Sequence, residues 1–389
     1  MLHAIYKFPC FLAACPPTEQ WSSVMATEST PGIVGVDLFC GAGGLTHGLA
    51  RGGINVKAGV DLDPSCRYPF EANNDAVFLE RDVNDVSPEE LSPYFEQGDL
   101  SLLAGCAPCQ PFSSYSQGGR GKRRGMDWQL VSSFGRLVQS LQPDLVTMEN
   151  VSQLAGHSVF GEFLGHLKGY AVQWSVVDCI KVGIPQSRRR LVLLASKLGS
   201  EGLDIDYGST NPARTVRDEI EGLPPIAAGE QHSRDPLHIA SSLSEMNLRR
   251  IRASKPGGTW RDWDPELIAA CHRKDSGSTY PSVYGRMEWD NPAPTITTQC
   301  FGFGNGRFGH PVQDRAISLR EAAMLQTFPE SYKFVRDGEP IRFNRLGRLI
   351  GNAVPVRLGE VIGRTLVNHV RMVRGETETP LPARHGRLF

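Results

Sequence analysis

The segment Gly-Cys-Ala-Pro-Cys-Gln-Pro-Phe-Ser at residues 105–113 places a candidate cysteine nucleophile in a stiff loop. Pro108 and Pro111 flank the Cys109–Gln110 pair, and each proline fixes its φ angle and removes a backbone donor. The apolar run Leu100–Gly105 before it predicts a buried strand that ends in glycine. Cys109 then follows the carboxyl end of a strand, where open α/β sheets bind their ligands. A thiol held there suits covalent catalysis.

Two further candidate groups lie beside apolar strand patterns. Glu149 follows the strand predicted over residues 144–148, and Arg188 and Arg190 precede the strand predicted over residues 191–195. Alone, the glutamate is compatible with a surface carboxylate and the arginines with a basic turn. Their order and their positions at strand ends favour a common site with the cysteine.

A glycine-rich turn near the start of the chain predicts a cofactor site. Residues 33–39 form an apolar, strand-like run, and Gly41, Gly43 and Gly44 follow at once, before apolar residues at helical spacing. Strand, glycine turn and helix open a nucleotide-binding βαβ unit. A second predicted strand ends in Asp61, about twenty residues after the glycines, the usual distance for a ribose acceptor. The third glycine of the dinucleotide fingerprint is missing.

The composition indicates an ordinary globular protein long enough for two domains. The chain has 389 residues, of which 40% are hydrophobic and 21% charged, and no apolar run is long enough to span a membrane. The net charge of −1 means that affinity for nucleic acid must come from local basic clusters, at residues 120–124, at Arg249–Arg252 and around Arg345. Nine cysteines without framework spacing favour a reducing compartment, so we expect a cytoplasmic protein.

Taken in order, the motifs resemble those of the DNA (cytosine-5-)-methyltransferases of bacterial modification type. The resemblance extends from Ile33 to about Val370. The segments that carry it are Asp37–Gly44, Gly105–Ser113, Thr147–Val151, Ile184–Arg190, Ser318–Pro329 and Ile350–Pro355.

The resemblance implies an α/β fold with a Rossmann-like S-adenosylmethionine-dependent methyltransferase domain and a smaller, irregular target-recognition domain. The expected divisions are a disordered or mis-started extension (1–30), the catalytic domain (31–200), the target-recognition domain (201–335), a hinge and returning segment (336–374) and a tail (375–389). Within them, residues 292–301 predict a β-prone segment and Leu319–Phe328 an amphipathic helix. Pro355 is expected to begin a last helix whose apolar stripe faces the core.

The resemblance also implies a mechanism. The Cys109 thiolate attacks carbon 6 of cytosine, which loads electron density onto carbon 5. Glu149 acts at ring nitrogen 3, where charge develops, and Arg188 and Arg190 hold carbonyl oxygen 2 and orient Glu149. A base inside a duplex must leave the stack to reach the cysteine.

Binding residues follow from the same resemblance. The residues expected to bind S-adenosyl-L-methionine are Phe39, Gly41, Gly43, Gly44, Leu45, Asp61, Leu62, Asp82, Val83, Gly105, Pro108, Asn352 and Val354. Those expected to contact DNA are Ser113, Gln117, Lys122, Arg123, Arg124 and Gln186. The glycines and basic residues between Ser113 and Asp127 suit a loop that closes over the flipped base. No metal is expected.

Several alternatives remain open. Cys106 and Cys109 form a Cys-x-x-Cys pattern used by thioredoxin-like oxidoreductases, although that chemistry leaves the downstream acidic and basic candidates without a role. We expect Cys106 to be a small buried hydrophobic side chain. A metal site at these cysteines would need a second Cys or His pair at ligand spacing, and the sequence near them has none.

Two other functions are compatible with the catalytic motifs. A transfer-RNA branch of the family carries a Cys-Phe-Thr signature, but Cys300-Phe301 is followed here by Gly302. A non-catalytic DNA-binding relative is a third reading. The expected partner is double-stranded DNA, with a cognate restriction endonuclease as a further candidate, and the expected state is a monomer without membrane contact.

Overall fold

The computed structural model describes residues 32–108, 126–208, 213–274, 277 and 279–376. All that follows concerns the described residues of the unit Pro31–Phe389. The extension predicted over residues 1–30 lies outside the described residues and stays a prediction.

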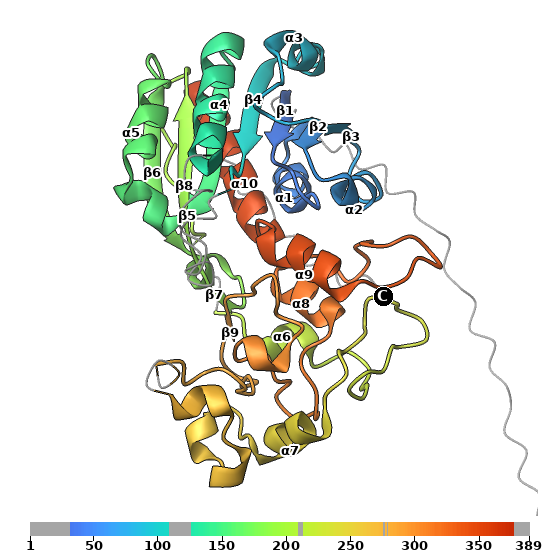
Figure 1. Cartoon of the computed structure of the whole chain (residues 1–389). Helices are drawn as coiled ribbons and strands as arrows, with labels where there is room; N and C mark the ends of the chain where they lie inside the picture. The colour runs from blue at the N-terminus through green and yellow to red at the C-terminus, as the bar shows by residue number, and fades with distance from the viewer. Residues whose placement is uncertain (1–31, 109–125, 209–212, 275–276, 278, 377–389) are drawn as a thin grey trace, which may run out of the picture. The chain divides into compact units, whose positions relative to one another are not determined.

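A seven-stranded sheet organises the first half of the described chain, in the order β3-β2-β1-β4-β5-β8-β6 (Figure 1). Its strands are β1 (Ile33–Leu38), β2 (Asn55–Asp61), β3 (Val77–Glu80), β4 (Leu100–Gly105), β5 (Leu145–Val151), β6 (Ala171–Asp178) and β8 (Arg189–Ser196). β8 runs antiparallel to β5 and β6, while the pairs from β3 to β5 are parallel. The described sheet thus has the mostly parallel, Rossmann-like architecture that the motifs imply.

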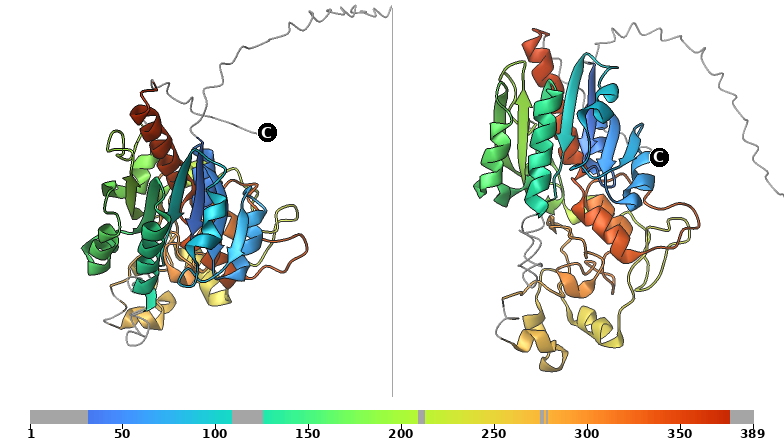
Figure 2. Two further views of the ribbon diagram at one scale, coloured as in Figure 1. Left: turned by 90° about the horizontal axis from the view of Figure 1, so that it is seen from above. Right: turned by 45° about the horizontal axis from the view of Figure 1, so that its top comes forward.

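Helices cover both faces of the sheet (Figures 1 and 2). The α-helices of the whole described chain are α1 (Gly44–Arg51), α2 (Arg67–Glu71), α3 (Pro88–Leu91), α4 (Met126–Leu141), α5 (Ser158–Gly165), α6 (Val216–Ile220), α7 (Glu245–Ala253), α8 (Leu319–Leu325), α9 (Phe343–Asn352) and α10 (Val356–Val373). Of these, α1, α4, α5 and α10 pack against the sheet. Alternate residues of β4 separate the two cores: Leu102 packs with α1 and α10, and Leu103 packs with α4 and α5. A strand buried on both faces explains the continuous apolar run of β4.

The last helix returns to the first one through glycines. A Cβ added at Gly48 of α1 would lie 2.3 Å from the carbonyl oxygen of Val356, and one at Gly52 would lie 2.7 Å from the Cα of Gly363. The backbones of α1 and α10 therefore approach more closely than side chains would allow. The predicted apolar stripe is confirmed, since its residues Leu358, Ile362, Leu366 and Val370 are all fully buried. α10 begins at Val356, one residue later than predicted, and Pro355 is its N-cap.

Substitution of Gly48 should test this packing. Gly48→Ala is expected to destabilise the protein by about 1–3 kcal/mol, because the new methyl group clashes with the α10 backbone. The matched control is Gly161→Ala in α5, where no described atom lies within 4 Å of the added Cβ. That change should stabilise by up to about 1 kcal/mol through helix propensity. Thermal unfolding of the two variants measures the difference, and equal midpoints would contradict the close approach.

The second half of the described chain is irregular, as predicted. After β8 ends at Ser196, β9 (Ala293–Pro294) is the one strand of the described residues, and it forms a two-stranded sheet with β7 (Gln186–Ser187), which precedes β8. The prediction of a β-prone segment over 292–301 was therefore mostly wrong, because only β9 pairs and Ile296 N instead donates to the Gln186 side chain at 2.9 Å. The helix predicted over Leu319–Phe328 is confirmed as α8 but ends three residues earlier.

One hydrophobic cluster joins the two halves. It combines Phe70 and Phe78, from the segment around α2 and β3, with Ile220 of α6, Leu325 of α8 and Ile350 of α9. A domain boundary near residue 200 therefore stays a prediction. None of the helices in the described residues is sufficiently long and apolar to cross a membrane.

Candidate active site

The carboxyl ends of β1, β4 and β5 meet at one edge of the sheet. The strand order changes direction between β1 and β4, which is where ligands bind in open α/β sheets. Because β8 runs in the opposite direction, its first residues lie at the same edge, and Arg190 of β8 pairs with Val151 of β5. This topology brings together candidate residues that are far apart in the sequence.

The carboxyl group of Glu149 has two partners at this edge, one through an ion pair and one through a hydrogen bond. Its Oε1 forms an ion pair with Nε of Arg190 at 3.0 Å, and its Oε2 accepts a hydrogen bond from Sγ of Cys106 at 2.8 Å. Glu149 is 2% exposed. Burial and the neighbouring Glu149 carboxylate raise the pKa of the Cys106 thiol well above its ordinary value, so this thiol remains protonated and donates. Cys106 packs against the hydrophobic core, as predicted, but it is only half-buried and its thiol also donates to Glu149.

Arg188 lies apart from this pair. Its guanidinium donates to the carbonyl oxygens of Ile296 at 3.3 Å and Ala353 at 3.4 Å, and its Nε has no hydrogen-bond partner among the described residues. Burial lowers the pKa of Arg188 to about 9. Arg188 also donates to Oε1 of Gln186 at 3.4 Å. Two of its side-chain hydrogen bonds thus join the residue before β8 to the second half of the chain, whereas Arg190 contacts Glu149.

Gln186 is fully buried, which contradicts its predicted contact with DNA. Its Nε2 donates to Oε1 of Gln326 at 2.9 Å, and its Oε1 accepts from Ile296 N at 2.9 Å. These hydrogen bonds of the Gln186 amide group join β7 to the end of α8 and to the segment after β9. The sequence around Gln186 did not indicate this burial, because the residue stands beside an arginine-rich turn.

The nucleophile candidate and the predicted DNA loop lie outside the described residues. These are Cys109, Ser113, Gln117, Lys122, Arg123 and Arg124. The described chain reaches Pro108, which is half-buried, and resumes at Met126.

The turn between β1 and α1 has the backbone that its glycines predict. Gly41 has φ 53° and Gly43 φ 88°, and Phe39 adopts φ 60°, which is unusual for a side chain of this size. A Cβ at Gly43 would lie 2.6 Å from Nδ2 of Asn74, whereas one at Gly41 would meet no described atom within 4 Å. The turn is therefore tightly packed at Gly43 and open beside Gly41.

Acidic residues line the same turn. Oδ2 of Asp61 accepts from Gly41 N at 2.9 Å, and its Oδ1 accepts from Asp63 N at 2.9 Å. Burial raises the pKa of Asp61 above its ordinary value. Asp82 is half-buried, and its Oδ1 accepts from Asn84 N at 2.9 Å. Each carboxylate oxygen has a second lone pair, so both groups could also accept from a ligand.

The returning segment reaches this turn from the C-terminal side. A Cβ at Gly44 would lie 2.3 Å from the carbonyl oxygen of Val354, and Asn352 is exposed at the end of α9. Arg348 of α9 forms an ion pair with Asp63, which follows Asp61 by two residues. Among the other predicted cofactor residues, Leu62 is 64% exposed, whereas Leu45, Val83 and Gly105 are buried.

Asp37 tests whether this site suits a cationic cofactor. It lies in β1 directly before the turn and is fully buried, and its Oδ2 accepts from Oγ1 of Thr46 at 2.7 Å. Its Oδ1 has no hydrogen-bond partner among the described residues. Burial, with a smaller effect of the nearby Asp61 charge, raises the pKa of Asp37 to about 7. A cation at this turn would offset the cost of the buried carboxylate, so the residues fit S-adenosylmethionine, which carries sulfonium and ammonium groups.

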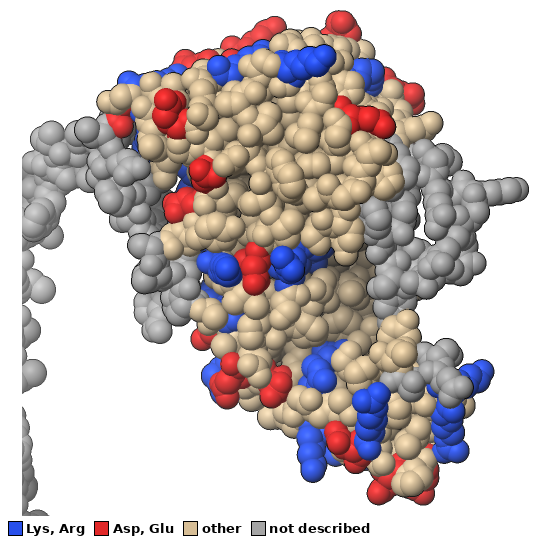
Figure 3. Space-filling view, turned by 90° about the vertical axis from the view of Figure 1, so that its left-hand side faces the viewer, with Lys and Arg blue, Asp and Glu red and all other residues tan. Residues whose placement is uncertain are grey.

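The second half of the chain carries exposed basic residues. Lys and Arg side chains gather with acidic ones at the lower end of the face in Figure 3, at the height at which Figure 1 places the segment after α7. The exposed basic residues of α7 and that segment include Arg249, Arg252, Arg261, Arg273 and Lys274. Arg249 is paired with Glu266 and Arg252 with Asp314.

Comparison with known proteins places the chain in a family. The model of the C-5 cytosine-specific DNA methylases matches residues 33–368. The chain belongs to this family. It is 51% identical over 336 residues to the Type II methylase M.HgiDII of Herpetosiphon aurantiacus, an alignment that covers 85% of this chain and 94% of that protein. It is 32% identical to the Type II methyltransferase M1.BsuMI of Bacillus subtilis, over 86% of this chain and 81% of the relative.

The fold agrees with solved structures. A prophage-encoded DNA modification methyltransferase from E. coli superimposes with a TM-score of 0.65 at 23% identity, over 87% of this chain and 99% of that one. The Dnmt2 methyltransferase of S. pombe gives a TM-score of 0.55 at 14% identity, over 88% of this chain and 99% of that one. The predicted family and the Rossmann-like fold are therefore confirmed, and the protein is a DNA cytosine-5 methyltransferase.

Two residues of the site had no assigned role in the sequence. Asp37 interrupts an apolar strand run, and a carboxylate in such a run signals a buried charge that needs a partner. Cys106 directly follows the β4 strand pattern, which puts it at the ligand edge of the sheet. The described residues contain no cluster of three or more side chains that could hold a metal ion.

Proposed function

We propose that this protein methylates carbon 5 of cytosine in duplex DNA through a covalent adduct of Cys109, as the modification enzyme of a restriction–modification system. The observation that carries the proposal is the position of the Glu149 carboxylate, which contacts Arg190 and Cys106 at the carboxyl ends of β4 and β5. Cys106 precedes Cys109 by three residues in the sequence. The Type II relatives support the modification role.

Each residue has a defined task in the proposed reaction. The Cys109 thiolate forms a bond to carbon 6 of the flipped cytosine, and carbon 5 becomes nucleophilic as the ring loses its aromaticity. Glu149 supplies a proton or a charge-assisted hydrogen bond to ring nitrogen 3, where negative charge develops, while Arg190 orients Glu149. After methylation a base removes the proton from carbon 5, and the carbon–sulfur bond breaks to release the thiolate. Arg188 is proposed to act at carbonyl oxygen 2, although its described side-chain hydrogen bonds go to Gln186 and to the backbone carbonyls of Ile296 and Ala353.

The cofactor is proposed to occupy the turn between β1 and α1. S-Adenosyl-L-methionine supplies an electrophilic methyl group as a sulfonium when it is bound. Phe39 and Gly41 would border it, the carboxylates of Asp61 and Asp82 would accept from its ribose and adenine, and Asn352 would complete the site. The buried carboxyl group of Asp37 would complement its positive charge.

Duplex DNA is the proposed partner. Phosphate contacts are assigned to Lys122, Arg123 and Arg124 and to the exposed basic residues over 249–274, because the net charge of −1 leaves only local clusters for this task. The bacterial relatives support a cytoplasmic location. The cognate nuclease and the monomeric state stay predictions.

Expression in a methylation-free bacterial host tests the function. Bisulfite sequencing of the host DNA should reveal 5-methylcytosine in one short sequence context. The matched control is Glu149→Gln, which keeps the size of the side chain but cannot ionise, and it should leave the DNA unmethylated. Methylated RNA together with unmethylated DNA would show that the substrate is RNA and not DNA. Methylation at the wild-type level by Glu149→Gln would show that Glu149 has no part in the mechanism.

A further inference from the structure

The backbone on either side of Cys106 is fixed by the neighbouring strands. Cys106 N donates to the carbonyl oxygen of Leu38 at the end of β1, at 3.2 Å. The buried Nδ2 of Asn150 in β5 donates to the carbonyl oxygen of Ala107, at 2.9 Å. The exit from β4 is thus tied to a strand on each side, so the Cβ of Cys106 starts from a defined position.

The Cys106 thiol then reaches a carboxylate that has one other partner, an ion pair. Sγ lies 2.8 Å from Oε2 of Glu149, while Nε of Arg190 lies 3.0 Å from Oε1. Cys106 directly follows β4 and Arg190 lies in β8, so the two partners come from either side of β5 in the sheet. Rotation of the carboxyl group would break at least one of these contacts, and each oxygen keeps a lone pair for a substrate. Because burial and Glu149 raise the pKa of the Cys106 thiol, it is a hydrogen-bond donor and a poor nucleophile.

We propose that Cys106 is a positioning residue for methyl transfer, whose thiol, together with Arg190, fixes the orientation in which Glu149 meets the flipped cytosine. This inference rests on the proposed function of Glu149. It gives the first cysteine of the Cys-x-x-Cys pattern a role that differs from disulfide chemistry. Cys106 does not itself react: it donates one hydrogen bond to Oε2 and keeps its proton throughout.

The test compares two replacements of Cys106. Cys106→Ala removes the donor and should lower kcat about tenfold, the effect of a lost hydrogen bond to a charged group, with KM for DNA and cofactor within about twofold. Cys106→Ser keeps a donor and should retain kcat within about threefold. The pH profile of kcat for the alanine variant should differ from that of the wild type, because alanine donates no hydrogen bond to Oε2 of Glu149. The serine variant should restore the wild-type profile.

Controls separate the possible outcomes. Cys271→Ala, which changes an exposed cysteine, should behave as wild type in every assay. A lower thermal unfolding midpoint for Cys106→Ala with wild-type kcat and pH profile would leave only a packing role and overturn the proposal. Equal loss of activity in the serine and alanine variants would also overturn it. The Glu149→Gln variant reports separately on the proposed function: if it is inactive while Cys106→Ala is fully active, only the role of Cys106 fails.

Discussion

Cys109→Ala is expected to lower methyl transfer by at least about a thousandfold, because loss of a covalent nucleophile removes most of the rate enhancement of an enzyme. Without the bond to carbon 6, carbon 5 of cytosine stays too electron-poor to accept a methyl group. Binding of duplex DNA and of S-adenosylhomocysteine should persist, since neither depends on the covalent bond. Transfer of a labelled methyl group and equilibrium binding to both ligands measure the two effects.

A trapping experiment strengthens this test. Duplex DNA with 5-fluorocytosine at the target should form a stable adduct with the wild-type protein, because fluorine cannot leave as a proton does. Cys109→Ala should form no adduct, and Cys106→Ser should still form one. Near wild-type methyl transfer by the alanine variant would remove Cys109 from the mechanism. An adduct with transfer RNA but not with DNA would point to the other branch of the family.

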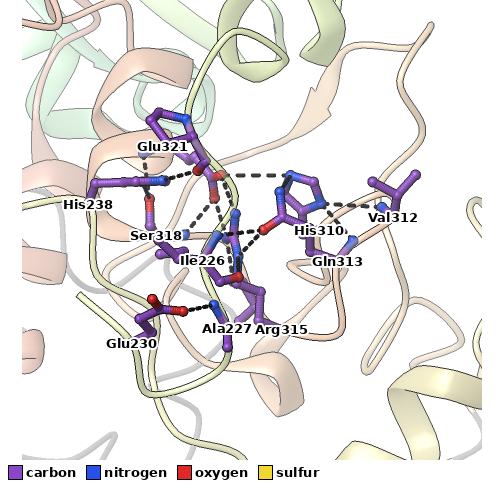
Figure 4. A network of polar contacts seen from close by, with 12 residues as sticks. Ile226, Ala227, Glu230, His238, His310, Val312, Gln313, Arg315, Ser318 and Glu321 are labelled. Atoms are coloured by element: carbon purple, nitrogen blue, oxygen red, sulfur yellow. Dashed lines mark hydrogen bonds and ion pairs between the residues drawn. The ribbon is translucent and has the colours of Figure 1, made fainter. Parts of the chain in front are cut away.

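Glu321→Ala should destabilise the second half of the chain by about 3–5 kcal/mol, the usual cost of breaking a buried ion pair from one side. Arg315 donates to both carboxylate oxygens of Glu321 at 2.7 Å, and both side chains are almost completely buried (Figure 4). Without Glu321, the Arg315 guanidinium remains buried without a counter-charge. Ser318 N, which donates to the same carboxylate at 2.7 Å, would also lose its acceptor.

The matched control is an exposed ion pair in the same half of the chain. Glu266 pairs with Arg249, and their side chains are 67% and 46% exposed. Glu266→Ala should therefore cost less than about 1 kcal/mol. Urea unfolding of the two variants gives both free energies, and similar values would show that burial does not determine the strength of the Arg315–Glu321 pair.

The same network predicts acid sensitivity. Burial lowers the pKa of His310 to about 4, and its Nδ1 accepts from the backbone N–H groups of Val312 and Gln313, so the folded protein keeps this ring neutral. An unfolded histidine takes up its proton near its ordinary value of 6.5, so stability should fall as the pH drops from there towards 4. For Glu321, burial acts to raise the pKa but the Arg315 contacts outweigh it and lower the pKa; its stabilising effect is lost at still lower pH. The raised pKa of Asp37 acts in the opposite sense over the same window, so the contribution of His310 is the difference in pH dependence between the wild type and His310→Gln. The same pH dependence of the unfolding midpoint in both proteins would contradict the role of His310.

Much of the catalytic framework could be predicted from local sequence. Leu100–Gly105 and residues 191–195 are continuous apolar runs, which a strand buried on both faces requires, and both are strands in the structure. The turn at Gly41 and Gly43 followed from glycine's freedom to adopt positive φ. The β-prone segment over 292–301 failed because propensity does not supply a partner strand: of these residues, only Ala293 and Pro294 pair.

Side-chain environments were less accessible to sequence reasoning. Gln186 follows a proline and precedes three arginines, a local pattern that favours exposure, yet it is fully buried between β7, α8 and the segment after β9. Two of its partners, Gln326 and Ile296, lie 140 and 110 residues away along the chain. No local pattern reports on such contacts, because they depend on how the second half folds back onto the sheet.

The sequence by itself determined the family, the Rossmann-like architecture and the succession along the chain of the strands and turns that position the candidate residues. Periodicity and glycine content act within a few residues of the chain, so they can be recognised there. Only the tertiary structure decided that Cys106 reaches Glu149, that Arg190 rather than Arg188 contacts this carboxylate, and that Asp37 is buried with an unpaired oxygen. These contacts arise because β4, β5 and the reversed β8 lie side by side, and the order and direction of strands in a sheet are set by packing of the whole chain.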